Sequence, residues 1–272
     1  MIKSNSDRVF SIIMKEKLVG NLMVSDLVVH SIIVAYNGVL TIVFKAFTKS
    51  IWSLKSILNN IDADDEFHLP RENIGTKWPK ITIACLNDNQ YLSKHQLSLL
   101  SNICNDIINN NNNQDIKISI RNLSIVDYFN RSLNPPFKSV KRLCLENNDN
   151  NNDNNNNSNV CESKNSVDCT FNRDSQLLVN EIVEETKHLE SYYEKVTPLL
   201  KDNRNHYKHY NDYVEESSLV AFILGDCVGS ESTTLLLQLI DQLKQCIEST
   251  NDLKNLYTWM PLQSLHISIR AI

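Results

Sequence analysis

The order of predicted elements repeats once along this 272-residue chain. Each copy consists of a strand, a helix, a Trp-Pro or Trp-x-Pro element and a second strand. The first copy spans residues 38–86 and the second spans residues 217–272. Two such units related by a pseudo-twofold axis would form two similar lobes, with the polar faces of their last strands turned toward a shared cleft. The repeat therefore limits the possible folds more than any single motif does.

Hydrophobic periodicity predicts the individual elements. The repeat is expected to hold strands over 38–47, 80–86, 219–224 and 265–272, and helices over 48–60 and 232–249. The rest of the chain is expected to add strands over 8–14 and 22–35, one or two strands over 116–128, and helices over 92–109 and 174–200. We therefore predict an α+β protein with two pseudo-symmetric lobes of antiparallel sheet, outer helices and a central cleft. It would be one bilobal domain over 1–272, with its lobes formed by about 38–133 and 215–272.

Two asparagine-rich runs interrupt this pattern. Asn109–Asn113 is unbroken, and residues 147–159 contain only Asn, Asp and Ser. Because such runs offer no apolar surface to bury, they are typical of disordered insertions. With its flanks, the second run predicts a disordered Asn-rich insertion over 139–173.

The charge balance limits the possible partners. The net charge is −5, so the chain lacks the global positive field that drives nonspecific binding to duplex DNA. A small phosphodiester or an RNA terminus bound in a local pocket remains compatible with this charge. The composition does not predict an oligomeric state.

Cysteine usage and hydropathy indicate the compartment. The seven cysteines are odd in number, none forms a CxxC pair, and the start of the chain lacks a secretory apolar region. Polar residues interrupt the apolar stretch 18–43, which favours buried strands over a membrane span. We therefore expect reduced thiols in a cytoplasmic protein, or alternatively a nuclear one, with no membrane partner.

The C-terminal segment 264–272 alternates polar and apolar residues, as a strand with one buried face does. His266, Ser268 and Arg270 would then lie on one face, about 7 Å apart. A base, a hydroxyl and a guanidinium in one row suit the handling of a phosphate group. The alternative interpretation is an ordinary strand, with a structural His266 and with Arg270 in an ion pair.

Alignment of the two repeats supplies a facing strand for this row. It places Lys80 opposite His266 and Thr82 opposite Ser268. Trp78 precedes the first of these strands and could stack on a base, although a core role is the alternative. For Lys80 the alternative is an edge lysine that protects a sheet from aggregation.

These residues resemble the two-histidine phosphoesterases, which carry two His-x-Thr/Ser motifs on facing strands of two pseudo-symmetric lobes. The second motif is present here as His-Ile-Ser at 266–268, and Lys-Ile-Thr at 80–82 occupies the place of the first. The stretch 69–82 is similar to a divergent branch of eukaryotic proteins that also has lysine there. The resemblance covers about 38–133 and 215–272.

The resemblance implies hydrolysis of 2′,3′-cyclic or related phosphodiesters of nucleotides or RNA ends, with no metal and no cofactor. His266 would be the general acid or base, and Thr82 and Ser268 would hold phosphate oxygens. Lys80 and Arg270 would stabilise charge. Two alternatives remain: a catalytically inactive module that binds phosphate or RNA ends, and a scaffold whose partners bind elsewhere, for instance along 174–200.

Overall fold

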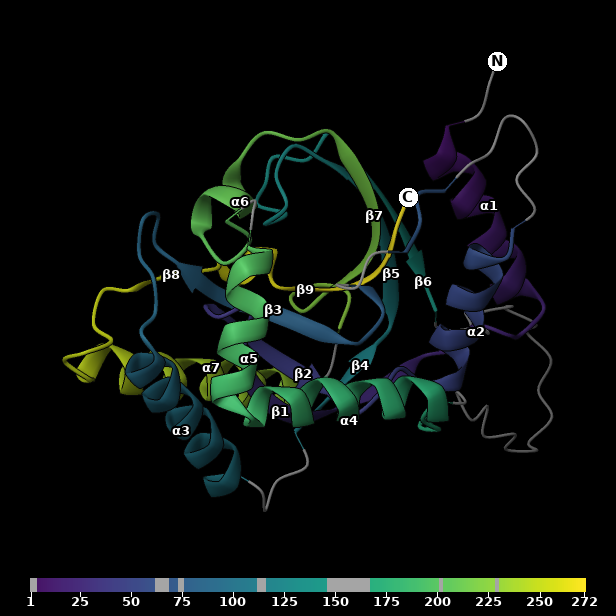
Figure 1. Ribbon diagram of the computed structural model, residues 1–272. Coiled ribbons are helices and arrows are strands. Elements are labelled where there is room, and N and C mark those ends of the chain that lie inside the picture. The colour runs from purple at the N-terminus through teal and green to yellow at the C-terminus, as the bar shows by residue number, and fades with distance from the viewer. Residues whose placement is uncertain are drawn as a thin grey trace.

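The computed structural model describes residues 4–61, 69–72, 76–111, 116–145, 167–200, 203–227 and 230–272. The described strands form two antiparallel sheets (Figure 1). The first sheet has the order β4-β1-β2-β3-β8, with bounds Lys117–Ile120, Ser25–Ala35, Val39–Phe44, Lys80–Leu86 and Tyr257–Trp259. The second sheet has the order β6-β5-β7-β9, with bounds Ser139–Cys144, Asn122–Tyr128, Glu216–Phe222 and His266–Ala271. This confirms the predicted α+β class with two sheet lobes.

The internal repeat is visible in the topology. β2 pairs antiparallel with β3, and helix α2 (Lys49–Asn59) connects them. β7 pairs antiparallel with β9, and helix α7 (Ser230–Ser249) lies between them in the chain. α2 begins where Thr48 caps its first turn by accepting a hydrogen bond from the amide of Ile51. The two strand–helix–strand units therefore share the same strand pairing.

The outer faces of both sheets bury one continuous apolar core. Alternate residues such as Ile81 and Ile83 of β3 and Ile267 and Ile269 of β9 belong to this core. Helices α1 (Asn5–Leu18), α2, α3 (Lys94–Asn110) and α7 contribute the rest of it. The other faces of β3 and β9 are left free to form a site between the sheets.

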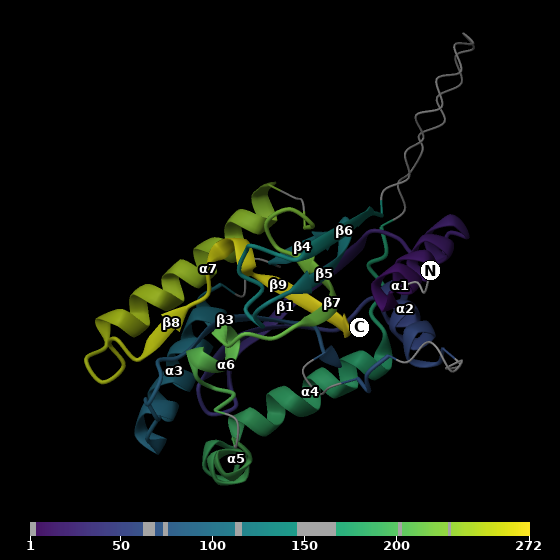
Figure 2. The ribbon, with the colours of Figure 1, turned by 90° about the horizontal axis from the view of Figure 1, so that it is seen from above.

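Helix α4 (Arg173–Lys187) covers part of the first sheet from the inner side. Its Val179 and Val183 pack with Val39 and Val43 of β2 and with Trp78 in a second buried cluster. Figures 1 and 2 together place α4 and α7 on opposite sides of the first sheet. The first sheet therefore carries helices on both faces, which the sequence-based prediction did not include.

Two element predictions differ from the structure. Residues 8–14 lie in helix α1, in which Val9 and Ile13 are buried one turn apart, so the predicted strand is wrong. The predicted helix 174–200 breaks at His188 into α4 and α5 (Leu189–Val196), which a short 3₁₀ turn follows. The remaining short helix is α6, Tyr207–Asn211.

The predicted disordered insertion 139–173 includes residues at both ends that belong to the fold. Its start is β6, which pairs with β5 and buries Leu143, and residues 146–166 lie outside the described residues. At its end, the Asp168 carboxylate accepts a hydrogen bond from the amide of Ser50 at 2.7 Å. Both flanks therefore belong to the fold, because their apolar and capping groups have partners in it. No helix in the described parts of the chain is long and apolar enough to cross a membrane.

Candidate functional site

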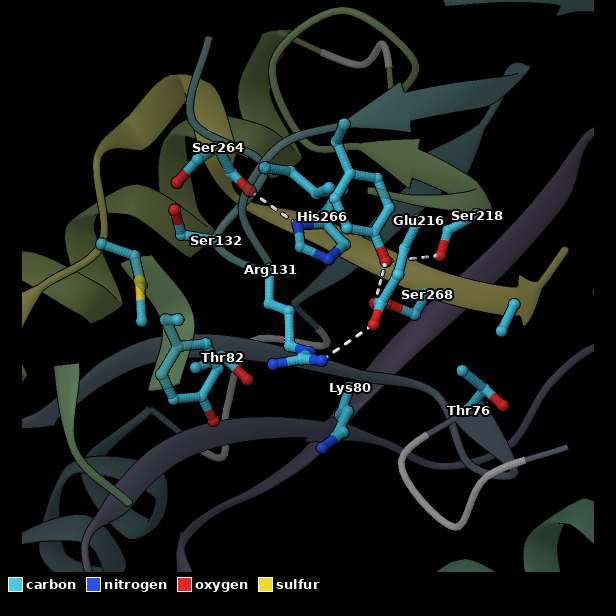
Figure 3. Close-up of a pocket in the computed structure, with 15 residues that line it drawn as sticks. Thr76, Lys80, Thr82, Arg131, Ser132, Glu216, Ser218, Ser264, His266 and Ser268 are labelled. Carbon is cyan, nitrogen blue, oxygen red and sulfur yellow. Dashed lines mark hydrogen bonds and ion pairs between the residues drawn. The ribbon is translucent and has the colours of Figure 1, made fainter. Parts of the chain in front are cut away.

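A pocket of about 200 Å³ lies between the inner faces of the two sheets (Figure 3). Lys80 and Thr82 of β3 line one side of it, and His266 and Ser268 of β9 line the other. The remaining lining residues are Thr76, Tyr128, Arg131, Ser132, Leu133, Tyr210, Glu216, Ser218, Met260, Ser264 and Ala271. The structure thus brings together the four residues that the sequence predicted as catalytic.

Matching β-bulges follow the two hydroxyl residues. In the β2–β3 pair, the register shifts between Thr82 and Ala84. In the β7–β9 pair, it shifts between Ser268 and Arg270. The bulged residues, Ile83 and Ile269, occupy equivalent places in the sequence repeat. A bulge inserts one extra residue and reverses the facing of the residues beyond it, so both polar rows end at the same point.

His266 has a defined tautomer. Its Nδ1 lies 2.7 Å from the carbonyl oxygen of Ser264, and a carbonyl can only accept a hydrogen bond. Nδ1 therefore carries the proton, and Nε2 is left as the acceptor. Burial, reinforced by the nearby positive charge of Lys80, lowers the pKa of His266 to about 4. The imidazole is therefore neutral at pH 7 and can accept a proton at Nε2.

Lys80 presents an amine without an ionic partner. No hydrogen bond or ion pair joins its Nζ to any described residue. The amine lies 4.8 Å from the ring centroid of Trp78 and 5.7 Å from that of Tyr36, both within the range of cation–π attraction. Burial lowers the pKa of Lys80 to about 8, so the amine is mostly protonated at pH 7. A half-buried ammonium of this kind suits an anionic ligand.

The two hydroxyls differ in their surroundings. The Thr82 side chain shares a hydrogen bond with the phenol of Tyr210, whose pKa is raised because the phenol is buried. The Ser268 hydroxyl has no partner among the described residues and remains able to donate to a ligand. Both can contribute donors to phosphate oxygens, Ser268 without giving up an existing bond.

A polar network that the sequence-based prediction missed forms another wall of the pocket. Arg131 Nη2 donates to Glu216 Oε1 at 2.8 Å, and the Tyr128 hydroxyl donates to Glu216 Oε2 at 3.1 Å (Figure 3). Tyr128 also lies 3.2 Å from the hydroxyl of Ser218. Arg131 sits in the loop after β5, and Glu216 and Ser218 precede the strand predicted over 219–224, so the hydrophobic pattern marked none of these three residues. Arg131 is the guanidinium that reaches the pocket.

Arg270 does not line the pocket. It is 3% exposed, and its guanidinium donates to Asn59 Oδ1, to the Ala271 carbonyl and to the Pro70 carbonyl at 2.6–2.9 Å. The bulge at Ile269 turns it off the face that His266 and Ser268 share. The expected charge-stabilising role in the cleft therefore does not fit its position.

Trp78 is also absent from the pocket wall. It is 3% exposed within the cluster beneath α4, so its ring has no face open to a base. Its ring contacts the Lys80 amine instead, so it can act only by positioning that amine. The core interpretation of this residue fits its burial.

The arrangement combines a neutral acceptor nitrogen, an ammonium, two hydroxyls and a guanidinium around one small cavity. Such a set can bind a phosphate group and move a proton on it. In the described parts of the chain, no group of three or more His, Cys, Asp or Glu side chains could hold a metal ion. No protein-family model matches the chain, and no curated protein or solved structure matches it either.

Proposed function

We propose that this protein is a phosphodiesterase that hydrolyses 2′,3′-cyclic or related phosphodiesters of nucleotides or RNA ends. The observation that carries the proposal is the pairing of Lys80 and His266 across one pocket, each followed by a hydroxyl and a bulge. This pairing matches the place of the two motifs in the two-histidine phosphoesterases, which the sequence resembles.

His266 and Lys80 would divide the proton transfers between them. His266 Nε2 would take a proton from the attacking water, whose oxygen bonds to phosphorus. The Lys80 ammonium would stabilise the negative charge that develops and donate a proton to the leaving ribose oxygen as the P–O bond breaks. The Ser268 and Thr82 hydroxyls would hold the non-bridging oxygens. The pKa values of about 4 and about 8 leave both groups in the required forms at pH 7.

The same pKa values support a second candidate, a module that binds a phosphate or RNA end without hydrolysis. A histidine whose pKa is about 4 is a weak base, so its proton transfer has less driving force than that of an ordinary histidine. Hydrolysis by this pair is therefore expected to be slow. If its rate were negligible, the protein would only bind the phosphate.

Hydrolysis of a nucleoside 2′,3′-cyclic phosphate, and of RNA that ends in one, tests the proposal. We expect turnover by the purified protein and a fall of about 10²–10⁴-fold in His266→Ala. His95→Ala is the matched control, because His95 is 70% exposed on α3 and pairs with Asp252. Binding without turnover, weakened by Lys80→Ala, would favour the module. An absence of both binding and turnover would exclude both candidates.

A further inference from the structure

The pocket contains one acidic residue among its charged groups. Lys80 and Arg131 are its cations, Glu216 is its anion, and His266 is neutral at pH 7. The described wall of the pocket therefore carries a net charge of about +1 at that pH. A site that only had to bind phosphate tightly would gain nothing from the carboxylate.

We propose that Glu216 is a charge-selectivity residue, which weakens binding of doubly charged phosphomonoesters more than binding of singly charged phosphodiesters. This inference rests on the proposed function. Hydrolysis converts a diester with one negative charge into a monoester whose second pKa is about 6. The product therefore carries close to two charges at pH 7. A fixed carboxylate in the pocket would repel the product more strongly than the substrate and so favour its release.

The position of the Glu216 carboxylate is fixed on both sides. One oxygen accepts from Arg131 Nη2 at 2.8 Å and the other from the Tyr128 hydroxyl at 3.1 Å. Burial raises the pKa of Tyr128 to about 12, so this phenol stays protonated and keeps donating at neutral pH. The carboxylate therefore stands in the pocket wall as a permanent feature, with Arg131 partly neutralised beside it.

The expected effect follows from Coulomb's law. The Glu216 side chain is 43% exposed, so water screens it substantially. For a ligand charge about 6 Å away at an effective dielectric constant of about 40–80, one carboxylate changes affinity about three- to tenfold. The change in binding free energy is twice as large for a doubly charged ligand as for a singly charged one. Removal of the carboxylate should therefore shift the monoester-to-diester affinity ratio by about three- to tenfold.

Two ligands that differ by one methyl group and one charge test this. They are 2′-deoxyadenosine 3′-monophosphate and its methyl diester, titrated by calorimetry into the wild-type protein and Glu216→Gln at pH 7. The variant should bind both more tightly, with the larger gain for the monoester. At pH 5.5 the monoester is mostly singly charged, so its additional gain should disappear, while Lys80 remains protonated and His266 neutral. Glu215→Gln, next in the chain but outside the pocket wall, should leave the ratio unchanged.

Arg131→Gln provides an independent test with the opposite sign. It removes a positive charge, so it should weaken the monoester more than the diester. An unchanged affinity ratio in both variants would overturn the inference while leaving the proposed function intact. Failure of the wild-type protein to bind either ligand would also overturn it, and hydrolysis of the cyclic nucleotide would then decide the proposed function separately.

Discussion

His266 and Lys80 hold opposite protonation states across the pocket at neutral pH. Each state has a local cause: burial removes the charge of the imidazole, whereas the ammonium keeps its charge beside two aromatic rings. In the proposed mechanism these states assign the roles, with His266 on β9 as the base and Lys80 on β3 as the acid. Two histidines have the same reference pKa, so only a difference in their surroundings could give them opposite protonation states.

These roles predict a bell-shaped dependence of kcat/KM on pH. His266 acts only when neutral, so the rate should rise as pH increases past about 4. Lys80 acts only when protonated, so the rate should fall as pH increases past about 8. In Lys80→Arg the guanidinium keeps its charge but cannot give up a proton, so kcat/KM should fall and the alkaline fall should disappear. An alkaline fall that stays at the same pH in this variant would contradict the assignment of Lys80 as the acid.

The tautomer of His266 can be tested without any substrate. The hydrogen bond to the Ser264 carbonyl requires the proton on Nδ1, whereas most free imidazoles carry it on Nε2. Two-bond ¹H–¹⁵N correlation spectra should show a neutral ring with its proton on Nδ1 at every pH above about 4. The spectrum of His266→Gln assigns the signal. A Nε2–H form, or a ring already protonated at pH 6, would be the contrary result.

At the scale of the elements, the bulge in β9 is held by a lysine from α2. Lys55 is 2% exposed, and its amine donates to the carbonyls of Ile269 and Thr76 and pairs with Glu72. Ile269 is the extra residue of the bulge, so Lys55 satisfies a carbonyl beside the irregular register. This contact joins the helix of one repeat to the strand of the other that lines the pocket.

Lys55→Met should therefore lower the free energy of unfolding by about 3–5 kcal/mol, because it leaves Glu72 and the two carbonyls without their partner. Chemical denaturation of the two proteins measures the difference. Lys49→Met in the same helix is the control, since Lys49 is exposed. A loss below about 1 kcal/mol would mean that water replaces the amine at little cost.

The sequence predicted these elements unevenly, for physical reasons. Alternation over 80–83 and 265–270 predicted β3 and β9 and placed Lys80 with Thr82, and His266 with Ser268, on one face each. In 265–270 the alternation continues past Ser268 without a break, so it could not reveal the bulge at Ile269. Arg270 was therefore assigned to the wrong face. The apolar run 8–14 is short enough to fit a strand or a helix. It forms part of helix α1, in which Val9 and Ile13 are buried one turn apart.

At the scale of the whole molecule, the described strands cross between the sheets three times: from β4 to β5, from β7 through α7 to β8, and from β8 to β9. Only Arg121 separates β4 of the first sheet from β5 of the second, and residues 260–265 connect β8 of the first sheet to β9 of the second. The predicted lobe segments, about 38–133 and 215–272, therefore each contribute to both sheets. The sequence repeat predicted two similar units but carried no information on this exchange of strands.

These crossings predict a single cooperative unfolding transition, because neither sheet can be completed without both segments and one core serves both. Urea titrations followed by far-ultraviolet circular dichroism and by tryptophan fluorescence should coincide. Trp78 and Trp259 report on the first sheet and Trp52 reports on α2 and the main core, whereas circular dichroism reports on both sheets. Two separate transitions would show that the lobes fold independently.

The central claim is that Lys80 and His266 act on the same phosphodiester. A double-mutant cycle on the hydrolysis of a nucleoside 2′,3′-cyclic phosphate, with Lys80→Ala, His266→Ala and the double variant, tests it most directly. We predict that each single variant loses about 10²–10⁴-fold in kcat/KM and that the double variant is little worse than the poorer single one. Fully additive losses, or single variants as active as the wild-type protein, would contradict a shared site.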